Sequence, residues 1–253
     1  MICVKYEPGC LGNFMCQVLQ GHGPAVALDY GTLNTVEIFH TGAYDNVDDP
    51  RFQKNFHLNQ HKIISHNSAD FEDFLYADSN LKFVFISLKS HFIYYRLNYM
   101  HKMPDWHQRS NLYDLEAWRN FDHPIALADA RRIYRLHLDN EQVMKQKSKD
   151  LVFPFANFYK EKDIWVDNFL HLAEQLDLNL SEKQLHDWHA SFTLGQKDII
   201  EKAELIRACI EQEKFTNELN ENEKGLIIGH VAVKQRIDDA NFFDEIYSRF
   251  STP

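Results

Sequence analysis

Short apolar runs alternate with segments of helical spacing along the first ninety residues of the chain. Three of these runs, at residues 2–6, 61–66 and 82–88, predict β-strands. The run at 82–88 is almost uninterrupted, which is typical of a strand buried on both faces of a sheet. A further strand is expected around 35–40, and DLVFPF at 150–155 predicts another. Strands that alternate with helices indicate a parallel sheet.

The segments between and after these strands mostly predict helices. A helix follows the turn at Pro8 and Gly9, and a second one begins with Ser68 as its cap. The polar stretch up to about residue 59 predicts irregular structure. Further helices are expected at 91–103, 124–146 and 161–176, from Ser181 onward, and through most of the remaining chain.

Composition and charge narrow the function classes. The 253 residues are 44% hydrophobic, enough for a sizeable core, and none of the 9 glycines falls between Tyr44 and Leu194. We therefore expect one domain over residues 1–253 rather than a repeat or linker architecture. The net charge of −10 argues against a nucleic-acid or anionic membrane partner. Four cysteines without a CxxC pair, and no signal peptide or long apolar span, favour a cytoplasmic protein.

The loop EPGCLGNF, residues 7–14, joins the first strand to a helix. A helix N-terminus presents unpaired amides to an anion, and Gly9 and Gly12 would let the backbone approach a phosphate. The loop is not a Walker motif, because Asn13 and Phe14 stand where lysine and a hydroxyl would be needed. The alternative is a tight turn that needs glycine only for its backbone dihedrals.

A longer constellation spans residues 61–103 and contains IISHN, KFVFISLKS and IYYRLNYMHKM in that order. It resembles the central block of cytosolic-type sulfotransferases. In that family a strand ending in Lys-Ser-His or Lys-Thr-His leads to a short helix, a KxxYVxRNP strand and a tyrosine-rich helix ending in His-x-x-Met. YEPGCLGNF resembles the family's phosphosulfate loop YPKSGTTW. NEKGLIIGH and the segment after it resemble the family's Arg-Lys-Gly segment and closing helix, and residues 151–185 resemble a strand and helices of the same family.

The resemblance implies an α/β fold of the P-loop nucleotide-kinase type, a three-layer sandwich with a central parallel sheet and many peripheral helices. It also implies 3′-phosphoadenosine 5′-phosphosulfate (PAPS) as the donor and in-line sulfuryl transfer to a hydroxyl or amine of a small molecule. Such a reaction needs a general base and donors around the phosphates, but no metal or covalent intermediate. No motif specifies the acceptor or an oligomeric state.

The same resemblance assigns roles to particular residues. His66 falls on the family's catalytic histidine, and its ordinary pKa suits a general base. The resemblance places the donor's phosphates on Gly9, Cys10, Leu11, Gly12, Asn13, Phe14, Lys89, Arg96, Lys224 and Gly225.

Departures from the family pattern concern the donor. The loop lacks the family's lysine and paired hydroxyls, so its backbone amides would do the binding. Leu88 stands at the family's arginine position, and Arg96, at its serine position, could compensate with help from Lys89. Glu223 replaces an arginine beside Lys224 and is expected to repel phosphate.

Other readings remain open. His66 could be a loop histidine that caps the next helix, and Arg96 an ordinary solvated helix residue. Cys10 could be a nucleophile if the helix N-terminus lowered its thiol pKa. For the whole chain, the alternatives are a catalytically inactive binding or interaction module on the same fold and a phosphoryl-transfer enzyme.

Overall fold

The structure is a computed structural model of the chain. It describes residues 1–6, 10–21, 23–24, 38–41, 46–57, 63–66, 71–87, 93–94, 97, 151–235 and 242–250. Contacts divide the chain into two compact units. The sheet unit comprises Met1–His91 and Glu141–Gly195, and the helical unit comprises Phe92–Asn140 and Gln196–Pro253. The single domain expected over residues 1–253 stays a prediction.

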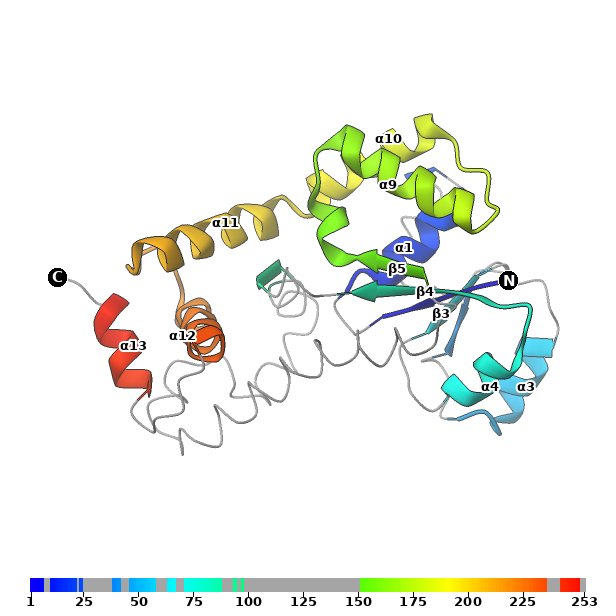
Figure 1. Cartoon of the computed structure of the whole chain (residues 1–253), viewed down its shortest axis with the longest axis horizontal. Coiled ribbons are helices and arrows are strands. Elements are labelled where there is room, and N and C mark those ends of the chain that lie inside the picture. Colours follow the sequence, from blue (N-terminus) through cyan, green and yellow to red (C-terminus); the bar gives the residue numbers. More distant parts are fainter. Residues whose placement is uncertain are drawn as a thin grey trace. The chain divides into compact units, whose positions relative to one another are not determined.

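The sheet unit is built on five parallel strands in the order β2-β3-β1-β4-β5 (Figure 1). The strands are β1 (Ile2–Lys5), β2 (Ile38–His40), β3 (Ile63–His66), β4 (Lys82–Ser87) and β5 (Leu151–Pro154). The main body of the sheet consists of β3, β1, β4 and β5, in that order, and the short β2 lies at one edge. This confirms the predicted α/β class with a parallel sheet and places each predicted strand.

β1 is the central strand, and its register sorts the side chains onto two faces. Cys3 pairs with Ile64 on one side and with Phe83 on the other. These three residues belong to one core cluster with Phe52 and Phe71. Since side chains alternate along a strand, the residues between them, such as Val4, lie on the opposite face.

Helices pack on both faces of the sheet. α3 (Pro50–His57) and α4 (Glu72–Ala77) lie on the face of Cys3, where the Phe52 ring is stacked 5.4 Å from Phe56. α1 (Gly12–Leu19), α9 (Lys162–Gln175) and α10 (Glu182–Gly195) share an aromatic core on the other face. There the Phe14 ring of α1 lies 5.4 Å from Trp188 of α10.

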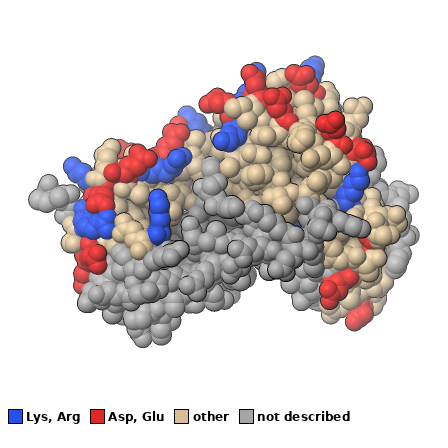
Figure 2. Space-filling view, viewed as in Figure 1, with Lys and Arg blue, Asp and Glu red and all other residues tan. Residues whose placement is uncertain are grey.

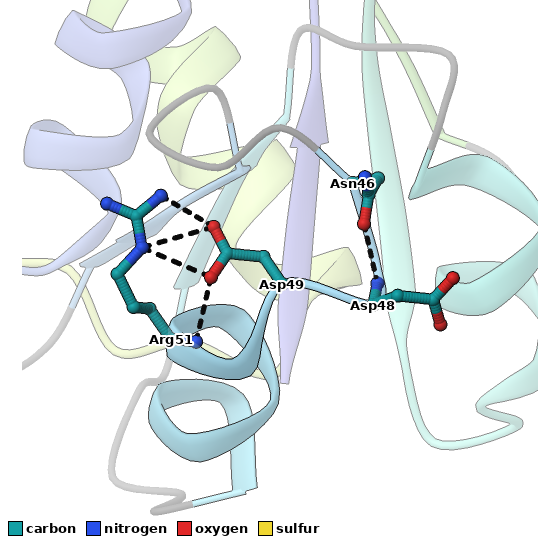
Figure 3. A network of polar contacts seen from close by, with 4 residues as sticks. All are labelled: Asn46, Asp48, Asp49 and Arg51. Atoms are coloured by element: carbon teal, nitrogen blue, oxygen red, sulfur yellow. Dashed lines mark hydrogen bonds and ion pairs between the residues drawn. The ribbon is translucent and has the colours of Figure 1, made fainter.

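The start of α3 lies in the stretch that was expected to be irregular (Figure 3). That expectation was wrong because two start signals outweigh the polar composition. Pro50 occupies the first helical position, where its missing N–H costs nothing. The Asp49 carboxylate accepts the Arg51 backbone N–H at 2.8 Å and pairs with the Arg51 guanidinium at 2.6 Å. The Arg51 hydrogen bonds lower the pKa of Asp49. Before it, Asn46 Oδ1 accepts the Asp48 N–H at 2.9 Å and closes a turn.

Several predicted helices are confirmed with small shifts. α4 begins after Phe71 without a side-chain cap, and the expected Ser68 cap lies outside the described residues. β5 runs into a 3-10 helix, Phe155–Tyr159, before α9, and α10 starts directly after Ser181. The helices expected at 91–103 and 124–146 lie outside the described residues, apart from Ile93, Tyr94 and Leu97 in the first of them.

The described part of the helical unit contains α11 (Lys197–Gln212), α12 (Glu221–Gln235) and α13 (Phe242–Phe250), as the sequence predicts. Arg249 of α13 pairs with Glu213 at the end of α11 and donates to Gln235 Oε1 at 2.8 Å. The Phe215 and Phe250 rings lie 5.2 Å apart. None of the helices in the described segments has the length and apolar character needed to cross a membrane.

Candidate functional site

The carboxyl ends of β1 and β3 lie side by side in the middle of the sheet, because the Cα of Lys5 pairs with that of His66. The chain leaves β1 toward α1 on one face, and it leaves β3 toward α4 on the opposite face. Such a topological switch point is where open parallel sheets bind their ligands. We call Lys5, Tyr6, Asn13, Ser65 and His66 the strand-end site. His66 is the last residue of β3, as predicted; its side chain lies outside the described ones.

α1 starts in an unusual way for a helix that follows a strand. Leu11, at its N-cap, has a φ of 61°, a left-handed conformation that is uncommon for a bulky residue. Leu11 supplies no side-chain cap, and the first turn of the helix carries no acidic residue. The first-turn amides therefore face the strand-end site without a carboxylate of their own turn against them.

Gly12 is needed at this position because of Tyr6. A Cβ on Gly12 would lie 1.9 Å from the Tyr6 ring, which is far inside van der Waals contact. The glycine thus allows the tyrosine ring to lie against the first turn of α1. The space next to the Gly12 Cα, which the sequence assigns to a phosphate, is filled by this ring on the side where a Cβ would stand.

Three polar side chains meet at the junction of β1, β3 and α1. Tyr6 Oη lies 2.5 Å from Asn13 Oδ1 and 2.6 Å from Ser65 Oγ, and Ser65 Oγ lies 2.9 Å from Asn13 Oδ1. Tyr6 and Ser65 are buried, and burial together with Cys16 holds the pKa of Tyr6 well above its ordinary value. The phenol therefore stays protonated and acts as a hydrogen-bond donor. This network fixes the first turn of α1 against the strand that ends in His66.

The peptide group before His66 is also anchored from β2. Thr41 Oγ1 donates to the Ser65 carbonyl oxygen at 3.3 Å, and His40 Nδ1 lies 3.4 Å from the same oxygen. Burial lowers the pKa of His40, so its ring is neutral at physiological pH. Neutral groups therefore hold this peptide in place.

Lys5 brings a positive charge to the site. It is only 4% exposed, its Nζ donates to the Tyr76 hydroxyl at 2.9 Å, and the same atom lies 4.7 Å from the Tyr76 ring centroid. On the described surface in view in Figure 2, acidic and basic side chains are interspersed. A cation for an anionic ligand would thus come from a local position rather than from a broad basic surface.

The predicted phosphosulfate loop can offer mainly its backbone. The side chains of Cys10, Leu11 and Phe14 are buried in the core. Burial also raises the pKa of the Cys16 thiol to about 12. A buried Cys10 lacks the exposure that a cysteine nucleophile needs, which counts against that alternative.

The C-terminal segment that is predicted to bind the PAPS donor lies in the first turns of α12, in the helical unit. Lys224 donates to Glu221 at 2.7 Å, and Gly225 is helical. Glu223, expected to repel phosphate, accepts the Asn220 N–H at 2.8 Å while Asn220 Oδ1 accepts the Glu223 N–H at 2.9 Å. These two bonds form a capping box. Glu223 also accepts from Lys202 at 3.2 Å, which balances its charge.

The residues of the predicted site are divided between the two units. His66 and the loop from Cys10 to Phe14 belong to the sheet unit, whereas Lys224 and Gly225 belong to the helical unit. Gly9, Lys89 and Arg96 lie outside the described residues, so their roles stay predictions.

Sequence reasoning missed Lys5, Tyr6 and Ser65. For Lys5 a signal was available, because a lysine ends the first apolar run. No sequence pattern predicts the hydrogen bond between Tyr6 and Ser65, which lie far apart in the chain. Within the described segments, no group of three or more His, Cys, Asp or Glu could hold a metal ion.

Comparison with family models, with curated proteins and with solved structures finds no match for this chain. The resemblance to sulfotransferases therefore rests on the residues quoted for it. Any function must be argued from the strand-end site itself.

Proposed function

We propose that this chain is a divergent sulfotransferase-like enzyme that moves a sulfuryl group from PAPS to a hydroxyl or amine of a small molecule. The proposed fold is a three-layer sandwich of the P-loop nucleotide-kinase type. One observation carries the proposal: β3 ends in His66 beside β1, and Ser65, the residue before it, donates to Asn13 in the first turn of α1. A base and an anion-binding helix start at one crevice are what this reaction needs.

The chemistry assigns one task to each part of the site. For a hydroxyl acceptor, a lone pair of the oxygen attacks sulfur and forms a new S–O bond. The bond between sulfur and the 5′-phosphate oxygen breaks, and its electron pair stays on that oxygen, which releases adenosine 3′,5′-bisphosphate. The acceptor proton passes to His66, which acts as general base.

The surroundings of His66 support its role as base. The preceding peptide is bonded through Ser65 to β2, and the Ser65 hydroxyl contacts α1. A catalytic group needs such a fixed backbone, because small displacements cost rate.

The start of α1 supports binding of the donor's phosphosulfate. The backbone of residues 9–14 would donate to it, since the first turn of α1 holds no acid and Leu11 supplies no side-chain cap. The strained Leu11 backbone fits a functional turn, because strained residues cluster at ligand sites. Lys89 and Arg96 are proposed for the 3′-phosphate. Lys224 and Gly225 would join them only if Lys224 exchanged Glu221 for phosphate.

A second candidate is a non-catalytic binding or interaction module on the same fold. The observation that favours it is that the loop side chains of Cys10, Leu11 and Phe14 face the core rather than a ligand. The loop 7–14 also contains no lysine. These two features are expected of a chain that has kept the sheet but no longer binds the PAPS donor.

Nucleotide binding separates the two candidates. We expect adenosine 3′,5′-bisphosphate to raise the Tm of the full chain more than AMP or ATP does at equal concentration. Calorimetric titration of the same three nucleotides then provides dissociation constants. If none of them binds, the sulfotransferase proposal is wrong and the binding module is favoured.

Replacement of the proposed base tests the catalytic role. His66→Ala should lower kcat for sulfuryl transfer about 10²- to 10⁴-fold and leave the bisphosphate dissociation constant unchanged. His171→Ala is the matched control, because His171 lies exposed on α9. Unchanged turnover in His66→Ala would exclude His66 as the base.

A further inference from the structure

The hydroxyl of Tyr6 lies at the junction of β1, β3 and α1. Tyr6 directly follows β1, its ring lies against Gly12, and the residue is 8% exposed. A phenylalanine ring would fill the same space, so packing alone does not explain a tyrosine at this position. A buried hydroxyl is costly without partners, and those of Tyr6, Asn13 and Ser65, both belong to the strand-end site. The hydroxyl therefore has a role that packing does not supply.

The three side chains contact one another pairwise. Asn13 Oδ1 lies 2.5 Å from Tyr6 Oη and 2.9 Å from Ser65 Oγ, and an amide oxygen has two lone pairs with which to accept both protons. The third contact joins Tyr6 Oη and Ser65 Oγ at 2.6 Å. Each side chain is therefore held by the other two, and loss of one hydroxyl breaks two of the three contacts.

Ser65 connects this network to the backbone of His66. The Ser65 carbonyl belongs to the peptide group that His66 completes, and its oxygen accepts from Thr41, the residue after β2, at 3.3 Å. The Ser65 hydroxyl is bonded to Tyr6 after β1 and to Asn13 in α1. The end of β3 is therefore fixed through a backbone atom next to β2 and through a side chain next to β1 and α1.

We infer that Tyr6 is a positioning residue for His66, because its hydroxyl, through Ser65 and Asn13, holds the end of β3 at a fixed place relative to the start of α1. The inference deepens the proposed function and rests on it for the reaction. In that reaction the base comes from β3 and the phosphosulfate binds at the start of α1, so the rate depends on the distance between the two elements. A displacement of about 1 Å can lower a rate on the order of 100-fold.

Tyr6→Phe is the first test, in the full chain. The variant keeps the ring against Gly12 and removes the hydroxyl, so kcat for sulfuryl transfer should fall about 10-fold. The KM for PAPS and the dissociation constant of adenosine 3′,5′-bisphosphate should stay within about twofold of the wild type, because the bond between Ser65 and Asn13 remains. This split between kcat and binding is expected of a misplaced base rather than of a damaged donor site.

Ser65→Ala removes the other hydroxyl of the network and should lower kcat by a similar factor. The double variant Tyr6→Phe/Ser65→Ala should lose little more than the worse single variant, because either change already breaks two of the three contacts. Ser248→Ala is the matched control, since the Ser248 hydroxyl donates to Glu245 within α13, and it should react like the wild type. Losses in kcat that multiply in the double variant would contradict a shared role.

A spectroscopic readout follows His66 without any turnover. The imidazole Cε1–H signal of His66 in an NMR spectrum is identified by its absence in His66→Ala. Its chemical shift and its titration midpoint should change in Tyr6→Phe and in Ser65→Ala, whereas the signal of the exposed His171 should stay in place. A general loss of stability would lower the Tm without moving one histidine signal selectively. If one of the two variants does not melt cooperatively, the other decides.

The outcomes separate this inference from the proposed function. If the wild type transfers a sulfuryl group, the role of Tyr6 requires both a lower kcat and a moved His66 signal in the variants, and either one without the other overturns it while the proposed function stands. If the wild type transfers no sulfuryl group but the His66 signal moves, the positioning role stands and the PAPS proposal falls. If there is no transfer and the signal stays in place, both are overturned.

Discussion

Two helix N-termini were assigned to the same nucleotide donor, and they differ in every feature that matters to an anion. α1 starts in the sheet unit at Leu11, which supplies no side-chain cap, and the first turn of α1 holds no acid. α12 starts in the helical unit with a capping box between Asn220 and Glu223 and with a second acid, Glu221. The first-turn amides of α12 already have a carboxylate, whereas those of α1 have none from their own turn.

A lysine-glycine match in sequence is thus a poor guide to a phosphate site. At α12, Lys224 and Lys202 each pair with a glutamate, so a phosphate would have to displace carboxylates. At the start of α1, the first-turn amides have no acidic side chain in their own turn. The start of α1 is therefore a better place than the start of α12 for the charged part of a ligand.

Adding one methyl group at Gly12 should disrupt the packing of Tyr6 against the start of α1. Gly12→Ala should lower the free energy of unfolding by about 3 kcal/mol, because the new Cβ would overlap the Tyr6 ring and force it out of place. Urea titration followed by circular dichroism measures the loss.

Gly195→Ala is the control for the glycine change. Among the described residues, nothing outside the local backbone of α10 comes within 4 Å of a Cβ built on Gly195, which ends α10 in the same unit. Gly195→Ala should stay close to the wild type. A Gly12→Ala variant as stable as this control would contradict the close approach of Tyr6.

The start of α12 should depend on its own acid. Glu223→Ala removes one acceptor of the capping box and the partner of Lys202, which we expect to cost about 2 kcal/mol of unfolding free energy. Lys224→Ala breaks only the pair with Glu221, whose side chain is 60% exposed, and should cost about 0.5 kcal/mol or less. Equal losses in the two variants would remove the contrast between the two helix starts.

A smaller effect than the loss of Glu223 is expected from a change of pH. Burial, with a contribution from Lys234, lowers the pKa of His230 in α12 to about 4. The unfolded chain, with an ordinary histidine pKa near 6.5, binds more protons than the folded chain, so stability falls as the pH drops below about 6.5. Between pH 7 and pH 6 His230 should account for a loss of about 0.7 kcal/mol.

His230→Leu checks this assignment. Its urea midpoint should change less than that of the wild type between the two pH values. A His230→Leu variant with the same pH dependence as the wild type would show that His230 is not the group responsible.

The strands were predictable because a buried strand requires a short run of apolar residues, which can be seen in the sequence. β1, β3, β4 and β5 coincide with apolar runs, and their alternation with helices implies the parallel sheet. α3 was missed because polar composition was weighed above the Asp49-Pro50 start signal, which is local and readable.

The site was less predictable because its contacts are distant in sequence. The position of His66 at a strand end follows from the run that it closes. The bonds of Tyr6 to Ser65 and of Lys5 to Tyr76 join residues 59 and 71 positions apart. The sequence alone predicts that Glu223 repels a phosphate. The ion pair that balances its charge was not predictable, because its partner Lys202 lies one helix earlier in the chain.

The central place of β1 also has a consequence for biosynthesis. Both of its neighbours arrive much later, since Ile2 pairs with Ile63 and with Lys82. Both partners of β1 are therefore distant in sequence, which is the kind of pairing that slows folding and leaves apolar segments exposed during synthesis. A nascent chain halted before residue 63 would carry the strand that ends in Lys5 with neither of its neighbours, and we expect it to need a chaperone.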